Sequence, residues 1–242
     1  MNVTRSTSQA EPHWTKYDAS VRPQALILML HGGKDRSQDV VDSRSLSWRR
    51  SASMQRDIAR RAQEAGASVW LLRFTRRGWN GGADRIADAR TALDDVRRRL
   101  GDVPVVLLGH SMGGRTALSV SDDDDVRLVL GLAPWIERGD PTPRDGQKTV
   151  LIHGDRDVIT PLSASRLTVD AMLAAGEDAT LIRVARGEHA MVVRAGLWTA
   201  LVVDIVAATF VRELGGSPEP RSGPIGAVVA RAVHGGGGVM DI

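Results

Sequence analysis

The sequence LLGHSMGGRTAL at residues 107–118 places one serine between two glycines at the end of an apolar run. Gly109 lies two positions before Ser111, and Gly113 lies two positions after it. Where a buried strand turns sharply into a helix, the two backbones come close and leave room only for small residues. The pattern therefore predicts a strained turn that exposes the Ser111 hydroxyl at the carboxyl end of a strand. A tight turn with no reactive serine is the alternative interpretation.

Similar apolar runs recur along the chain and alternate with amphipathic segments. The runs are continuously apolar, which is typical of strands buried on both faces of a parallel sheet. The segments between them repeat apolar residues at helical spacing. This alternation predicts an α/β fold with a doubly wound, mostly parallel sheet and helices on both faces. The predicted strands are ALILML (25–30), SVWLLRF (68–74), VPVVLLG (103–109), VRLVLGLA (126–133), TVLIHG (149–154) and ATLIRVA (179–185).

The domain organisation follows from the same pattern. The chain has 242 residues, of which 42% are hydrophobic, enough for one substantial core. Residues 25–213 form the predicted domain, after an irregular N-terminal segment at 1–24. The Gly/Pro-rich tail at 214–242 is expected to be flexible, although its stretch IGAVVARAV is apolar enough to pack elsewhere. The connection PWIERGDPTPRDGQ is too short for a helical cap, so we expect no sizeable cap domain and an open site.

Composition and charge exclude several classes of function. The absence of cysteine excludes disulfides and cysteine-based metal or redox chemistry. The net charge is +3, but basic and acidic residues are interspersed, which argues against a nucleic-acid partner. The N-terminus lacks an apolar leader and no apolar run is long enough to span a bilayer, so we expect a cytoplasmic protein with no membrane partner. The oligomeric state is not indicated.

No metal or cofactor is predicted. The acidic run Asp122–Asp125 precedes a strand, where a solvated loop is the favoured interpretation over a metal site. The chain has no G-x-G-x-x-G opening a helix and no GK[ST], so nicotinamide and phosphate loops are absent from the pattern.

A reactive serine needs a histidine base, and the chain offers six histidines. His189 in ARGEHAM lies just past the last predicted strand. Parallel strands bring their carboxyl-end loops to one edge of the sheet, so His189 can reach Ser111. The other histidines lie in the irregular termini, in loops, or beside the serine with a side chain that leaves the turn in another direction. They are His13, His31, His110, His153 and His234.

The third group, an acid that orients the histidine, comes from the loop HGDRDVITP at 153–161. Asp155 and Asp157 both qualify by chemistry, and spacing alone does not choose between them. With either one, the chain order is serine, acid, histidine, which is the order of the α/β-hydrolases.

From about residue 25 to 212 the chain resembles the α/β-hydrolase superfamily, and within it the small, capless serine esterases of the dienelactone-hydrolase type. The resemblance is carried by LHGG, RRGWNGG, GHSMGG, HGDRDVITP and GEHAM, which follow successive predicted strands in the family's order. The family's acid loop has its acid at the second aspartate, which implies Asp157. One departure is Thr75, which stands where the family usually has an acidic residue.

The resemblance implies acyl transfer to water at a triad of Ser111, Asp157 and His189. It also implies that the backbone N–H groups of Gly33 and Met112 bind the oxyanion. The expected substrate is a small carboxylic ester with a short or compact acyl group. An acyl thioesterase with the same triad and a non-catalytic small-molecule binding protein remain as alternatives. The substrate pocket is expected to include His110, Trp79 and Trp135.

Overall fold

Strand β2 (Ala25–Leu30) shows why the apolar runs form the centre of the molecule. Its odd-numbered side chains pack in one hydrophobic core and its even-numbered side chains pack in another, on the opposite face of the sheet. A strand in this position needs apolar residues at every position, because successive side chains point to opposite faces. The continuous apolar pattern is therefore explained by a sheet that is covered on both sides.

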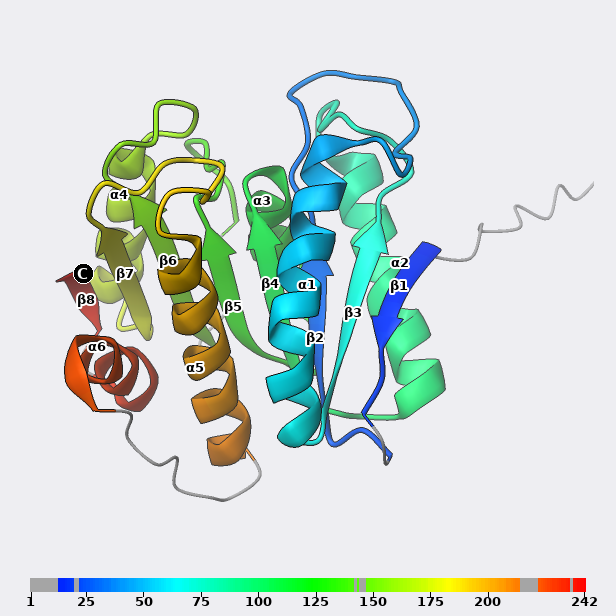
Figure 1. Ribbon diagram of the computed structural model, residues 1–242. Helices are drawn as coiled ribbons and strands as arrows, with labels where there is room; N and C mark the ends of the chain where they lie inside the picture. Colours follow the sequence, from blue (N-terminus) through cyan, green and yellow to red (C-terminus); the bar gives the residue numbers. More distant parts are fainter. Residues whose placement is uncertain (1–12, 20–21, 142, 144–146, 214–221, 236) are drawn as a thin grey trace, which may run out of the picture.

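The computed structural model of the chain describes residues 13–19, 22–141, 143, 147–213, 222–235 and 237–242. In this part of the chain the strands form one eight-stranded sheet in the order β1-β3-β2-β4-β5-β6-β7-β8 (Figure 1). Strand β1 is antiparallel to β3, and the other neighbours are parallel. Besides β2, the strands are β1 (His13–Tyr17), β3 (Ala67–Arg73), β4 (Val105–His110), β5 (Val126–Leu132), β6 (Lys148–Gly154), β7 (Ala179–Val184) and β8 (Gly238–Asp241).

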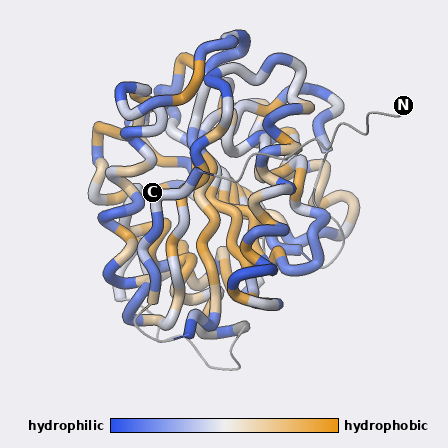
Figure 2. Tube along the Cα trace, turned by 90° about the vertical axis from the view of Figure 1, so that its right-hand side faces the viewer, coloured by the Kyte–Doolittle hydropathy of each residue, from blue (hydrophilic) through white to orange (hydrophobic). Residues whose placement is uncertain are grey.

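Helices cover both faces of this sheet. One face carries α1 (Leu46–Glu64), α5 (Ala195–Glu213) and α6 (Gly223–His234), and the other carries α2 (Ala83–Leu100), α3 (Met112–Ser119) and α4 (Leu162–Ala174) (Figure 1). Figure 2 shows the hydrophobic segments gathered along the strands in the interior. The predicted doubly wound α/β architecture is confirmed. None of the helices in the described ranges combines the length and hydrophobicity needed to cross a membrane.

In the described part of the chain no helical cap interrupts the sheet, as the short connection predicts. The chain leaves β5 at Leu132 and enters β6 at Lys148, and the described residues between them form loops and turns. Residues 142 and 144–146 of this connection lie outside the described part. The prediction that the chain has no sizeable cap domain is confirmed.

The C-terminal segment differs from the expected flexible tail. Helix α6 buries Val228, Val229, Ala232 and Val233 in the core beside α5, and β8 adds a parallel strand next to β7. Two of the glycines are required by this arrangement. A Cβ on Gly237 would lie 2.4 Å from the main-chain oxygen of Ala179, and Gly238 has a φ of +108°. The composition suggests disorder, whereas the glycines provide close approach and left-handed backbone conformation. Residues 214–221 and 236 lie outside the described part.

The N-terminal segment also contains more structure than expected. Residues 1–24 are predicted to be irregular, but His13–Tyr17 form β1 at the edge of the sheet. Trp14 packs against Trp70 of β3 with the rings tilted by 59° and their centroids 5.2 Å apart, and its indole N–H donates to Asp95 at 2.9 Å. These contacts hold the strand in place although its sequence lacks a long apolar run. Residues 1–12 and 20–21 are outside the described part.

Candidate active site

Ser111 occupies the corner between β4 and α3, with φ 54° and ψ −117°. This positive φ is rare for a residue other than glycine and signals backbone strain. The neighbours are glycines for a steric reason. A Cβ on Gly109 would lie 2.3 Å from the carbonyl oxygen of Gly113, and one on Gly113 would lie 2.0 Å from that of Leu30. The small residues around Ser111 are therefore required by backbone crowding.

The corner is held by hydrogen bonds to neighbouring strands and loops. The N–H of Ser111 donates to the carbonyl of Leu132 at 3.0 Å, and the carbonyl of Ser111 accepts from the N–H of Trp135 at 3.1 Å. Both partners belong to the end of β5 or to the loop after it. Ser111 is 8% exposed. The strained conformation is thus fixed by the surrounding structure.

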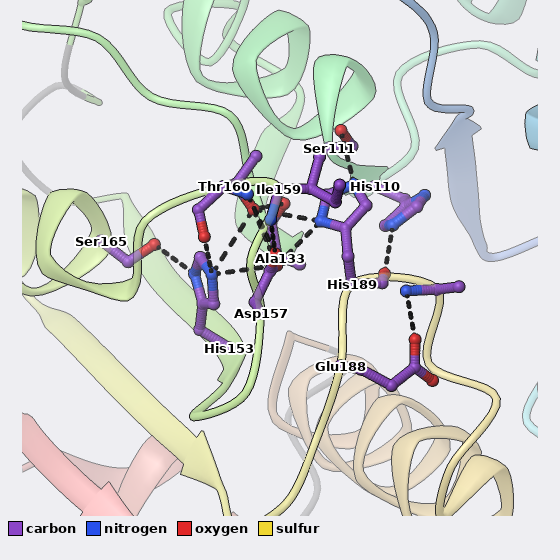
Figure 3. A network of polar contacts seen from close by, with 11 residues as sticks. His110, Ser111, Ala133, His153, Asp157, Ile159, Thr160, Ser165, Glu188 and His189 are labelled. Carbon is purple, nitrogen blue, oxygen red and sulfur yellow. Dashed lines mark hydrogen bonds and ion pairs between the residues drawn. The ribbon is translucent and has the colours of Figure 1, made fainter.

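His189 lies between Ser111 and Asp157 (Figure 3). Its Nε2 is 3.1 Å from the hydroxyl oxygen of Ser111, and its Nδ1 is 2.8 Å from Oδ2 of Asp157. A carboxylate accepts hydrogen bonds, so the proton is on Nδ1, and Nε2 is left to accept from the Ser111 hydroxyl. This arrangement can move a proton from a hydroxyl to an imidazole and hold the resulting imidazolium against a carboxylate.

The Asp157 carboxylate is fully buried and receives hydrogen bonds on both oxygens. The main-chain N–H groups of Ile159 and Thr160 donate to Oδ1 at 2.8 and 2.9 Å. The hydroxyl of Thr160 donates to Oδ2 at 2.8 Å, and Nε2 of His153 lies 3.2 Å from it. Burial raises the pKa of Asp157, but the bonds from His153, His189 and the main chain outweigh it and hold the pKa well below its usual range. Asp157 is therefore ionised at neutral pH.

Asp155, the other candidate acid, points elsewhere. Its Oδ1 accepts the main-chain N–H of Arg186 at 2.6 Å, and the residue is exposed. The structure thus brings Asp157 against His189, whereas Asp155, on the same loop after β6, is bonded to the loop that follows β7. This contact links the acid loop to the loop that carries His189.

His153 and Thr160 contribute to the site without having been candidates for it. His153 is fully buried; its Nδ1 accepts from the Ser165 hydroxyl at 2.8 Å, and its Nε2–H faces the Thr160 carbonyl at 3.1 Å. The Thr160 hydroxyl also lies 3.1 Å from Nδ1 of His189. The available sequence signal was the shared loop HGDRDVITP, in which a histidine and a threonine flank the acid.

Gly33 and Met112, the predicted oxyanion donors, lie against each other. A Cβ on Gly33 would lie 2.5 Å from the Sδ and Cε atoms of Met112. Met112 is the first residue of α3, and the N–H groups of the first helical turn have no partner within the helix. The loop before Gly33 is fixed by His31, which donates from Nδ1 to the Gly32 carbonyl at 2.6 Å and accepts at Nε2 from the N–H of Phe74.

A family model described as "Alpha/beta hydrolase family" matches residues 27–212. The chain belongs to this family. Its matched region runs from β2 to the last turns of α5 and includes every residue of the site described above.

Solved structures with the same fold are similar to this alpha/beta hydrolase over most of their length. A putative alpha/beta hydrolase from Agrobacterium tumefaciens has a TM-score of 0.66 at 15% identity, and the match covers 86% of this chain and 95% of that one. Thermogutta terrifontis esterase 2 phosphonylated by cyclosarin has a TM-score of 0.61 at 19% identity, and the match covers 85% of this chain and 90% of the esterase. An α/β serine hydrolase without a lid from Xanthomonas campestris has a TM-score of 0.60 at 17% identity, and the match covers 86% of this chain and 98% of the hydrolase. A search of curated proteins finds no significant sequence match.

The predicted pocket tryptophans of this alpha/beta hydrolase pack around an arginine. Trp79 is largely buried, and the guanidinium of Arg115 lies 4.5 Å from its ring centroid and 4.8 Å from that of Trp135. Arg115 also forms ion pairs with Glu137 at 2.9 Å and Asp140 at 2.7 Å. Arg115 is on α3, whereas its two carboxylate partners are in the β5–β6 connection. This cluster therefore holds that connection beside Ser111. A contact of either tryptophan with substrate stays a prediction.

His110, the other predicted pocket residue, makes a different contact. Its Nε2–H donates to the main-chain carbonyl of His189 at 3.0 Å, and the two rings lie 5.0 Å apart. Burial lowers the pKa of His110 to about 4, with the nearby ring of His189 as a further cause. His110 is therefore neutral at neutral pH.

The acidic run forms ion pairs. Arg97 of α2 lies 2.9 Å from Asp123 and 2.8 Å from Asp125, and Arg90 pairs with Asp122. These pairs connect the loop before β5 to the outer surface of α2. Among the described residues, no group of histidine and carboxylate side chains is arranged to hold a metal ion.

Proposed function

We propose that this protein is a serine hydrolase that cleaves carboxylic esters of compact acyl groups through an acyl-enzyme intermediate. The observation that carries the proposal is the position of His189, hydrogen-bonded to a strained elbow serine on one side and to a buried, ionised carboxylate on the other. A hydroxyl, a base and an orienting acid in this geometry are the components of nucleophilic acyl transfer.

In the first half of the reaction, Nε2 of His189 takes the proton of Ser111 while Oγ attacks the ester carbonyl. The negative charge that develops on the carbonyl oxygen is directed at the N–H of Gly33, in the loop after β2, and at that of Met112, at the N-terminus of α3. Asp157 stabilises the imidazolium through Nδ1–H. His189 then gives its proton to the leaving alcohol, and the acyl group remains bonded to Ser111.

In the second half, water replaces the alcohol. His189 removes a proton from the water, the resulting hydroxide attacks the acyl carbonyl, and the same N–H groups bind the oxyanion. Collapse of this intermediate returns the proton to Ser111 through His189 and releases the carboxylic acid. No cofactor is needed, because the protons and electrons balance within ester and water.

The surroundings of the site support an apolar substrate of limited size. Val158 and Ile159 lie beside Asp157 and are 91% and 69% exposed, while Val192 and Val193 follow His189 and are 65% and 50% exposed. Exposed aliphatic side chains on both of these loops suit the hydrocarbon parts of an ester. The absence of a cap leaves the site open, so we expect little additional binding energy for long acyl chains.

The proposal is tested with a fluorophosphonate probe, which forms a covalent bond to an activated serine. The structural neighbour from Thermogutta terrifontis is an esterase phosphonylated by cyclosarin. We expect the wild-type protein to be labelled on the peptide that contains Ser111, and the variant Ser111→Ala to remain unlabelled while its thermal unfolding is unchanged. Labelling elsewhere, or normal ester turnover by Ser111→Ala, would contradict the proposal.

A direct comparison of p-nitrophenyl acetate with acetyl-CoA addresses the thioesterase alternative. A higher kcat/KM for the thioester would replace the ester assignment while keeping the triad. A non-catalytic binding protein would neither be labelled nor turn over either substrate.

A further inference from the structure

The loop that carries His189 has an unusually strained backbone. Arg186, Met191 and Arg194 all have a positive φ, at 59°, 55° and 59°. None of them is glycine, and side chains disfavour this region of backbone space. A loop with several such residues keeps its conformation only when surrounding contacts fix it. The question is which contacts hold this loop in the shape that presents His189 to Ser111.

Some of the fixing contacts come from within the loop. The carboxylate of Glu188 accepts the main-chain N–H groups of Ala190 at 2.8 Å and Val193 at 2.9 Å, and also that of Val192. Figure 3 shows this carboxylate on the far side of the loop from Ser111. These bonds close the turn after His189, but they do not fix the turn relative to the sheet.

Two further contacts connect the loop to the body of the protein. His110, at the end of β4, donates from Nε2 to the carbonyl of His189 at 3.0 Å (Figure 3). Arg50 of α1 donates from Nη2 to the carbonyl of Met191. The two carbonyls are two residues apart, and their donors come from different elements. Arg50, His110 and Met191 also line one small cavity of about 10 Å³, so the two donors lie close to each other.

The environment of His110 fixes which nitrogen carries its proton. A carbonyl oxygen can only accept, so Nε2 must be protonated. Nδ1 is buried without a hydrogen-bond partner among the described residues, and a Cβ on Gly32 would lie 3.1 Å from it. A proton on Nδ1 would therefore have no acceptor, whereas a proton on Nε2 has one. The ring is held as a neutral donor that faces the main chain of His189.

We propose that His110 and Arg50 are positioning residues for His189, which hold the main chain of its loop so that the imidazole meets Ser111 in the reactive geometry. The inference rests on the proposed function of the Ser111 site. Asp157 sets the rotation of the imidazole ring, but it does not fix the position of the backbone that carries the ring. The bond from Arg186 to Asp155 restrains the start of the loop, and the carbonyl bonds from His110 and Arg50 restrain the part of the loop from His189 to Met191. A displacement of about 1 Å in a reacting group can cost on the order of 10² in rate.

The test compares two replacements of the same residue. His110→Phe keeps an aromatic ring but removes the donor, and we expect kcat to fall about 10- to 100-fold with KM changed less than about 3-fold. His110→Gln keeps an N–H at a similar distance from the backbone and is expected to recover most of the lost kcat. His13→Phe is the matched control, because His13 is an exposed histidine on the edge strand β1, whereas His110 is on the central strand β4. Equal kcat in the wild type and His110→Phe, or no recovery in His110→Gln, would overturn the proposal.

Arg50 provides an independent arm in case His110→Phe does not fold. Arg50→Met removes the donor to Met191 and is expected to lower kcat in the same way, whereas Arg50→Lys keeps a donor and is expected to retain more activity. If both Arg50 variants keep wild-type kcat, Arg50 has no positioning role.

An NMR measurement separates this proposal from the proposed function. Nitrogen-15 spectra of the histidine side chains at pH 7 should show His110 as the Nε2–H tautomer. They should also show the Nδ1–H proton of His189 at a shifted position in His110→Phe but near its wild-type position in His110→Gln. An Nδ1–H tautomer of His110, or identical His189 resonances in all variants, would contradict the positioning role. If the wild type showed these signals but was not labelled by the fluorophosphonate probe and did not hydrolyse esters, the proposed function would be wrong while the contact of His110 with His189 would stand.

Discussion

Replacing Asp157 by asparagine tests the electrostatic design of the site most directly. The carboxylate accepts hydrogen bonds on both oxygens, from main-chain N–H groups on Oδ1 and from side chains on Oδ2. An asparagine must place its NH₂ group where either Oδ1 or Oδ2 lies in the native protein. In either position the NH₂ group faces other hydrogen-bond donors and cannot accept from them. If it faces His189, the imidazole can restore the bond only by moving its proton to Nε2 and accepting at Nδ1.

That tautomer change determines the size of the effect. With a proton on Nε2, His189 can no longer accept the proton of Ser111, so the general base is lost while the fold is retained. The corresponding substitution in a well-studied triad lowers kcat by about 10⁴. We expect a loss of about 10³- to 10⁴-fold, which equals about 4–5.5 kcal/mol in the activation barrier. KM should change much less, because the Asp157 side chain is fully buried and does not face the substrate.

The assay is steady-state hydrolysis of p-nitrophenyl acetate, with urea unfolding to verify that the variant is folded. Asp155→Asn is the matched control, because an asparagine there can still accept the N–H of Arg186 through its oxygen. We expect this control to keep kcat within about 10-fold of the wild type. The reasoning is refuted if Asp155→Asn is the more damaging change, or if folded Asp157→Asn keeps more than about a tenth of the wild-type kcat.

Three further predictions concern the fold and the pocket. Truncation after Glu213 removes α6 and β8 and uncovers the core they bury, so we expect an aggregating product; a soluble, active product on size-exclusion chromatography would show that this segment is dispensable. The pKa values of His31 and His110 are lowered from 6.5 to about 4 by burial, so the unfolded chain binds more protons between these values. The free energy of unfolding should therefore fall by about 2–4 kcal/mol from pH 7 to pH 5, and an unchanged urea midpoint would contradict the burial of both rings. Across p-nitrophenyl esters from acetate to palmitate, kcat/KM should peak at short chains; a steady gain approaching about 0.8 kcal/mol per added CH₂ would reveal a deep groove instead of an open site.

The sequence predicts those parts of the molecule that are determined by local patterns. Continuous apolar runs identify the parallel strands from β2 to β7, and the glycines around Ser111 identify the elbow because backbone crowding there leaves no alternative. His189 follows from its place after a strand at the same edge of the sheet. Whether these residues perform catalysis stays a prediction, although the structure brings them within hydrogen-bonding distance.

Other features depend on tertiary contacts that leave no local signal. Spacing cannot choose between Asp155 and Asp157, because a two-residue difference in a loop is decided by how the loop packs. The contact of Arg115 with the tryptophans and the contact of His110 with His189 join segments that are distant in sequence or separated by several elements. The C-terminal glycines were misleading for a related reason. The same composition can produce a flexible chain or a tight main-chain approach such as that of Gly237 to Ala179.

The strained corner at Ser111 has a consequence for the order of events in folding. Its N–H bond requires β5, and the close approach of Gly113 to Leu30 requires β2. Neither partner is adjacent to the corner in sequence, and parallel pairings of this kind form slowly because long loops must close first. Helices can therefore form early in refolding, while the corner acquires its conformation only when the central strands have assembled. Helical circular dichroism should recover before reactivity towards a serine-directed probe does. In the time between, the chain has native-like secondary structure but Ser111 does not react with the probe.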